Sequence, residues 1–200
     1  MPDTAYYTAA ALRARVPDLL NEQTYLTADI DDLISEYEGV AERYRGCAFT
    51  SRAAVSEVHT LNAQGYIVTR WPFIQSVTSV AVVARDLTST SVTSTDWEIN
   101  SAPGIVDLGG TYTGRATIVY THYLTSTPSA TVLRGCREFV RASLLRQNSS
   151  MGRDVIRQGF EGGSTTQYST SDWNAGRPTG YITVDGILNS LTDYRRPGVA

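Results

Sequence analysis

The side chains best able to do chemistry in this 200-residue chain are two histidines, two cysteines and a short run of aspartates. His59 and His122 are the histidines, and each lies in a segment with the alternation of a β-strand. A Ser-His-Asp triad would need one of them, but with 18 serines in the chain a chance serine neighbour is uninformative. His122 has no cysteine or carboxylate nearby at metal-ligand spacing. We therefore expect no catalytic residue and no enzymatic activity.

Metal and cofactor motifs are equally weak. Asp29, Asp31 and Asp32 resemble the start of a calcium loop, but the turn glycine and the glutamate at the twelfth position are missing. All 17 basic residues are arginines, so a phosphate loop, which needs a lysine, is excluded. Cys47 and Cys136 are too few for a disulfide framework, and we expect two free, partly buried thiols. The sequence predicts no cofactor and no metal.

The elements that position these residues follow from the spacing of apolar side chains. Segment 27–46 has the i, i+3, i+4, i+7 stripe of an amphipathic helix, a shorter helix is expected at about 8–15, and helical spacing returns at 129–147. Between them valine, threonine and aromatic residues alternate in short runs. The runs predict strands at 53–61, 66–70, 77–84, 97–99, 105–108 and 116–123, a hairpin turn at 62–65, and a loop or polar edge at 87–95.

Residues 148–183 are rich in glycine, serine and threonine and too poor in aliphatic residues to fold alone. A short amphipathic run follows, and we expect it to bind a partner through Val184, Ile187, Leu188, Leu191, Tyr194, Arg195 and Arg196. The predicted fold is α+β, with amphipathic helices flanking a mostly antiparallel β subdomain and an extended C-terminal arm ending in a short helix. The predicted regions are an N-terminal helical region (1–50), the β subdomain (51–128), a helix packing on the N-terminal helices (129–147) and a partner-binding arm (148–200).

Charge is unevenly distributed along the chain, whose net charge is −3. Residues 1–50 hold nine acids against four arginines, whereas 129–147 hold four arginines against one glutamate. The acidic positions off the first apolar stripe are Asp31, Asp32, Glu36 and Glu42, and the arginines that share one face of the later helix are Arg134, Arg137 and Arg141. These faces could both be solvated, but they also suit a head-to-tail subunit interface, which closes into a ring.

Nucleic-acid and membrane binding are disfavoured by composition. A net-negative chain without lysine does not suit broad binding to phosphate or to anionic lipid, although a DNA-binding role for the arginine face is conceivable. No stretch approaches the roughly 20 apolar residues of a membrane span. The first residues also lack the basic start and apolar core of a secretory signal.

Four segments in this order carry a family resemblance. They are the acidic helix start Thr-Ala-Asp-Ile-Asp-Asp-Leu-Ile (27–34), Tyr-Arg-Gly-Cys-Ala-Phe-Thr-Ser-Arg (44–52), Trp-Pro-Phe-Ile-Gln-Ser-Val-Thr-Ser-Val (71–80) and Ala-Thr-Ile-Val-Tyr-Thr-His (116–122). With the proline-started helix after them, they make the chain resemble the head-tail connector (adaptor) proteins of long-tailed bacteriophages over about 24–147. The C-terminal residues 193–200 resemble that family too.

The resemblance implies a structural virion protein at the head-tail interface, made in the cytoplasm of a bacterial host. It implies a homo-oligomeric ring, typically a dodecamer, that binds the portal protein on one side, through the C-terminal run from Val184 to Arg196, and a neck or tail-proximal protein on the other. Double-stranded DNA would pass through the lumen without specific binding, and no membrane is involved. The main alternative is a carbohydrate- or surface-binding β module that presents Trp71, Trp97 and Trp173. A hydrolase using His59 or His122 is a more distant one.

Overall fold

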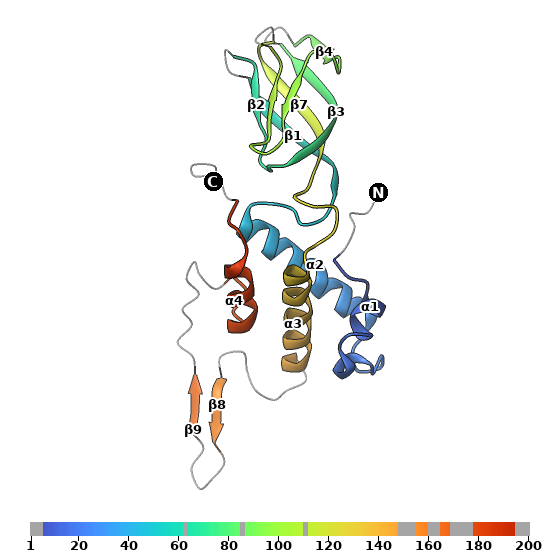
Figure 1. Cartoon of the computed structure of the whole chain (residues 1–200), viewed down its shortest axis with the longest axis vertical. Coiled ribbons are helices and arrows are strands. Elements are labelled where there is room, and N and C mark those ends of the chain that lie inside the picture. The colour runs from blue at the N-terminus through green and yellow to red at the C-terminus, as the bar shows by residue number, and fades with distance from the viewer. Residues whose placement is uncertain are drawn as a thin grey trace. The chain divides into compact units, whose positions relative to one another are not determined.

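The computed structural model describes residues 6–61, 64–84, 87–109, 112–147, 155–159, 165–168 and 178–194. These residues form two compact units. The β unit comprises the described residues of 42–129 with 193 and 194, and the helical unit comprises those of 6–41 and 130–192. In chain order, helices precede and follow the antiparallel strands of the β unit, so the predicted α+β fold class is confirmed (Figure 1).

Two antiparallel sheets build the β unit (Figure 1). The first has the strand order β1 (Arg52–Thr60), β7 (Arg115–His122), β3 (Ile74–Val83) and β4 (Ser89–Val92). The second has the order β2 (Tyr66–Val68), β6 (Ile105–Asp107) and β5 (Glu98–Asn100).

The inner faces of the two sheets share one apolar core. Along β7, Ala116, Ile118 and Tyr120 are buried while the residues between them face outward, as the two-residue period of a strand requires. Ile67 of β2 and Val106 of β6 enter the same core from the other sheet. The buried members of the core are Leu61, Ile67, Ile74, Val80, Val82, Val92, Val106, Leu108, Ala116, Ile118 and Tyr120.

The helical unit contains α1 (Ala9–Arg13), a 3₁₀ turn (Pro17–Leu19), α2 (Thr27–Arg45), α3 (Ala130–Gln147) and α4 (Ile182–Ser190). The boundary between the units falls within α2, whose last turn belongs to the β unit. α2 ends where the sequence predicts, because Gly46 has a φ of 71° and its N–H donates to the Glu42 carbonyl at 2.7 Å.

Aromatic side chains fill the centre of the helical unit. The fully buried ring of Tyr37 lies 6.1 Å from that of Tyr6 and 5.7 Å from that of Phe139, measured between centroids. Phe139 also meets Tyr181 edge to face at 5.7 Å. α4 packs beside α3 and buries Val184 with the same unit. These contacts place α2, α3 and α4 around one core.

Two local predictions need correction, and a third agrees with the structure. The hairpin expected at 62–65 is not formed, since β1 pairs with β7 and β2 pairs with β6. The polar segment 87–95, expected to be a loop or a polar edge, contains the edge strand β4, which pairs with β3. Within the expected arm the described residues include an antiparallel pair, β8 (Val155–Gly159) and β9 (Thr165–Tyr168), which the sequence did not predict.

Candidate functional site

The acidic side chains of α2 lie on its solvent-facing side. α2 buries Ile30, Ile34, Tyr37 and Ala41, which repeat at helical spacing, so the positions opposite this stripe point outward. Exposed among them are the predicted interface residues Asp31, Asp32 and Glu36. We call these three residues the acidic face of α2.

Glu42 does not belong to that face, and its predicted exposure is wrong. Its carboxylate is buried, and the Arg52 guanidinium donates to it through Nη2 at 2.8 Å and through Nε at 3.1 Å. The Phe49 N–H also donates to it at 3.4 Å. Arg52 begins β1, so this paired charge fastens the end of α2 to the first strand of the β unit.

The three arginines predicted on one face of α3 have different surroundings. Arg134 is exposed. Arg137 is partly buried and lies 3.4 Å from the carboxylate of its neighbour Glu138. Arg141 donates to Asp18 of the 3₁₀ turn at 2.7 Å, and this hydrogen bond raises the pKa of Arg141. Arg141 therefore ties α3 to the N-terminal segment of its own chain.

The predicted partner-binding run is divided between two environments. Val184 and Leu188 are buried on α4 within the helical unit, and Ile187 and Leu191 are partly buried. Outside α4, in the β unit, the Tyr194 N–H donates to the Arg45 carbonyl at 2.8 Å and its ring meets that of Phe73 edge to face at 5.0 Å. Arg195 and Arg196 lie outside the described residues.

Both histidines sit in a polar and aromatic cluster of the β unit, centred on Glu57. The Glu57 carboxylate lies 2.8 Å from His59 Nε2, and it accepts hydrogen bonds from the Tyr120 hydroxyl at 2.5 Å and the Arg70 N–H at 2.9 Å. Burial by itself would raise the pKa of Glu57, but these bonds outweigh burial and hold the pKa below its ordinary value. Burial, followed by the contact with Glu57, raises the pKa of Tyr120.

The ring of His122 is covered rather than open to a ligand. It stacks on Trp71 at 5.4 Å between centroids, nearly parallel, and lies 5.5 Å from the ring of Tyr120. Thus His59 is held by a carboxylate and His122 by aromatic rings. These contacts form a structural network of polar and aromatic side chains within the β unit.

The predicted thiols and tryptophans are also packed in place. Cys47 and Cys136 are free and buried, as expected. Burial, then the charge of Glu42, raises the pKa of Cys47 to about 12, and burial raises that of Cys136. Trp97 packs against the β core, as Trp71 does, and Trp173 is outside the described residues. Trp71 and Trp97 are therefore partly buried, and neither is positioned as an open stacking surface for a sugar.

The described residues contain neither a cluster of metal ligands nor a membrane-spanning helix. Within them, no group of three or more histidine, cysteine, aspartate or glutamate side chains is arranged to hold a metal ion. No helix among the same residues is long and apolar enough to span a bilayer.

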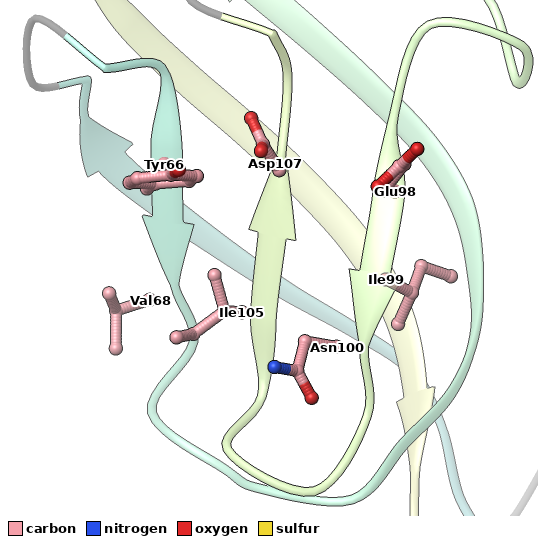
Figure 2. A pocket seen from close by; sticks show the side chains of 7 residues that line it. All are labelled: Tyr66, Val68, Glu98, Ile99, Asn100, Ile105 and Asp107. Atoms are coloured by element: carbon pink, nitrogen blue, oxygen red, sulfur yellow. The ribbon is translucent and has the colours of Figure 1, made fainter.

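A hollow on the outer face of the three-stranded sheet was not predicted. Its volume is about 410 Å³ and it is lined by Tyr66, Val68, Glu98, Ile99, Asn100, Ile105 and Asp107. Figure 2 shows these side chains on β2, β6 and β5. Tyr66 and Val68 are more than two-fifths exposed. The alternation of Tyr66, Ile67 and Val68 is visible in the sequence, but the strand pairing that gathers the acids beside them is not.

Two solved structures with a similar fold come from gene transfer agent particles. A chain in a structure of the virion of a native gene transfer agent (GTA) particle has a TM-score of 0.58 and 15% identity, covering 99% of this chain and 98% of that one. A chain from the neck of an empty GTA particle, computed with C6 symmetry, has a TM-score of 0.54 and 17% identity, covering 74% of this chain and 85% of that one. The likeness shows the fold. No protein-family model matches the sequence, and no curated protein matches it either.

Proposed function

We propose that this chain is a structural virion protein, a head-to-tail adaptor that forms a ring beneath the portal. The observation that carries the proposal is the likeness to a chain of the GTA virion along almost the whole length of both chains. The order of sequence segments that resembles the bacteriophage connectors leads to the same assignment independently. The absence of a metal cluster within the described residues, and the contacts that hold both histidines in place, are compatible with a non-enzymatic role.

A ring of identical copies needs two different surfaces that fit each other. The acidic face of α2 and the exposed Arg134 of α3, with the partly buried Arg137 beside it, are such a pair. One copy would present its carboxylates to the arginines of the next, a heterologous contact that closes into a ring. The similar GTA neck was computed with C6 symmetry. Twelve copies, as in the connectors that this sequence resembles, are compatible with a sixfold axis.

The charge of the chain suits a conduit for double-stranded DNA. The chain carries a net charge of −3 and no lysine, so it lacks the broad cationic surface that grips phosphate. A weakly repulsive wall lets DNA pass without being held. We therefore include DNA in the lumen, without specific binding, in the proposal.

The C-terminal residues are the proposed contact with the portal. Because Val184 and Leu188 are buried in the chain itself, the available part of the run is its exposed and partly exposed side. Ile182 is 75% exposed, Leu191 is partly exposed, and Arg195 and Arg196 follow in the sequence. The neck or tail-proximal protein would bind the opposite end of the ring. Repeated contacts around the ring would make weak individual contacts strong together.

Charge reversal at Arg134 tests the ring. Arg134→Glu should prevent assembly of the purified full-length chain, measured by native mass spectrometry and electron microscopy, because it places like charges at each contact. Arg15→Glu is the matched control, since Arg15 is also an exposed arginine of the helical unit but belongs to neither α2 nor α3. The combined Arg134→Glu and Glu36→Arg chain should recover assembly. Unimpaired rings from Arg134→Glu would contradict this contact.

Electron cryomicroscopy of purified particles tests the location. The adaptor proposal requires this chain as a ring between head and tail. A monomer that binds glycans and is missing from particles would favour the β-module alternative instead.

Substitutions on α4 test the proposed contact with the portal. Replacement of Ile182 by serine should reduce portal binding without unfolding the chain. Leu188→Ala should instead cost about 2–5 kcal/mol of folding free energy, because Leu188 is fully buried.

A further inference from the structure

The outer face of the four-stranded sheet has an unusual composition. The strand register places Thr60, Arg115 and Val83 in one row across β1, β7 and β3, and Val58, Thr117 and Ala81 in the next regular row. The row after that contains Ser56, Val119 and Ser79. Val58 is 55% exposed, and Arg115 is also exposed. We call these three rows the threonine-valine face, on which Arg115 is the single charged side chain.

The hollow on the three-stranded sheet contains acidic side chains, which complement the positive charge of Arg115. Figure 2 shows Tyr66, Asp107 and Glu98 side by side across β2, β6 and β5, and the register pairs Asp107 directly with both neighbours. Val68, Ile105 and Asn100 form the row beside them. One oxygen of Asp107 accepts the Gly109 N–H at 2.8 Å. Like charges directly opposite in a sheet are unfavourable, so a cation beside Glu98 and Asp107 would be stabilised.

We propose that the hollow receives the threonine-valine face of a second copy of this chain, with Arg115 of that copy between Glu98 and Asp107. A guanidinium presents a planar fork of donors, which suits two neighbouring carboxylates better than a point charge does. The uncharged β-branched side chains around Arg115 would cover Tyr66 and Val68, which are otherwise exposed to water.

The arrangement of the two sheets favours head-to-tail association over a closed dimer. Both inner faces pack on one core, so the two outer faces lie on opposite sides of the β unit. A contact between unlike faces leaves one of each free on the resulting pair, and the next copy can add in the same way. This inference rests on the proposed ring and supplies it with a second subunit contact, formed by β units rather than by helices.

Disulfide trapping tests the geometry. A full-length chain carrying Glu98→Cys and Arg115→Cys is oxidised at the highest concentration at which it stays soluble, and the products are separated under denaturing, non-reducing conditions. Because the contact joins unlike faces, the double variant should give a ladder of dimers, trimers and larger species. Each single variant should stop at dimers. The unmodified chain, in which the native Cys47 and Cys136 are buried, is oxidised in parallel to give the background level of crosslinking. A double variant that yields no ladder overturns the proposal.

Charge exchange tests the ion pairs. Glu98→Arg and Arg115→Glu should each raise the concentration needed for assembly by at least about tenfold, because each brings like charges together. The chain with both substitutions should return close to the original value. Asp96→Arg is the matched control, since Asp96 is an exposed acid of the β unit outside the hollow. Equal assembly by all four chains would overturn the proposal.

The outcomes separate this inference from the ring itself. Rings that form normally in the Glu98→Arg chain and give no ladder after trapping would refute the β-unit contact and leave the adaptor proposal intact. A ladder that ends at small open oligomers, with no ring in solution or in particles, would support the contact and contradict the adaptor. Thermal unfolding of each variant shows whether lost assembly reflects lost folding.

Discussion

The hydroxyl of Tyr37 on α2 occupies the space that a Cβ on residue 135 of α3 would need. Residue 135 is glycine, and its substitution by alanine would place the new carbon 3.0 Å from Tyr37 Cζ and in overlap with the hydroxyl oxygen. Tyr37 is fully buried between the rings of Tyr6 and Phe139, so it has little room to move. The close approach of α2 to α3 therefore depends on this glycine.

Gly135→Ala should destabilise the chain. Alanine favours a helix over glycine by about 1 kcal/mol, but overpacking a rigid core typically costs about 1–3 kcal/mol, and here the overlap should prevail. Gly39→Ala is the matched control because nothing lies within 4 Å of its added carbon, and it should stabilise α2. Adding Tyr37→Phe to Gly135→Ala should restore part of the loss. The measurement is the free energy of unfolding from urea titrations; equal gains from both alanine substitutions would contradict the packing argument.

The buried pair of Glu42 and Arg52 should be among the costlier contacts to break. Both side chains are almost excluded from solvent, with exposed fractions of 9% and 14%. Arg52→Ala should cost about 3–5 kcal/mol, since it removes a guanidinium that pairs with a buried carboxylate. Arg141→Ala removes a half-exposed pair with Asp18 and should cost no more than about 1 kcal/mol. Chemical denaturation of both variants compares them, and a loss for Arg52→Ala as small as that for Arg141→Ala would contradict this ranking.

The helices were predictable because the spacing of apolar residues that indicates a helix is a local property of the sequence. Ile30, Ile34, Tyr37 and Ala41 follow helical spacing, and all of them are buried. The same spacing places Glu42 off the apolar stripe, which is correct for an isolated helix. It does not reveal that Arg52, ten residues further on, turns back to bury that carboxylate. Glu42 was therefore misassigned because its surroundings depend on a residue outside the helix.

Strand positions were predictable and their pairing was not. Turn residues at 62–65 suggest a hairpin, but β1 finds its partner in β7 more than fifty residues away. The hollow also depends on a long-range pairing, because Tyr66 and Val68 lie beside Asp107 and Ile105 only when β2 aligns with β6. Glu98 joins them through the short connection between β5 and β6. Similarly, the apolar spacing of Val184 and Leu188 correctly indicates a buried helix face, but spacing alone does not distinguish α3 of the same chain from a partner.

The lowered pKa of Glu57 predicts a specific dependence of stability on pH. In the unfolded chain the carboxyl regains its ordinary, higher pKa, so between the two pKa values the unfolded state binds more protons. The stabilisation is thus present above the unfolded pKa and is lost as the pH falls through the folded one. Glu57→Gln should be less stable at neutral pH and should lose less stability on acidification towards about pH 3.

Urea midpoints measured across that range, with Glu36→Gln as the matched exposed substitution, test the dependence on Glu57. Glu36 is exposed on α2 and lies outside the Glu57 cluster, so its replacement should leave the contribution of that cluster intact. Parallel curves for Glu57→Gln and the original chain would show that the Glu57 cluster does not contribute to acid sensitivity.

The two thiols should report unfolding rather than react in the native state. The reactive species is the thiolate, and burial with the nearby Glu42 charge raises the pKa of Cys47 to about 12, while burial also raises that of Cys136. At about pH 8 an aromatic disulfide reagent should therefore label the folded chain slowly, and labelling should accelerate with urea in parallel with the loss of structure. Ser126→Cys supplies an exposed loop thiol as the positive control and should react at once. Rapid labelling of Cys47 or Cys136 in the absence of denaturant would show that one of the two units opens readily, and peptide mapping would identify which.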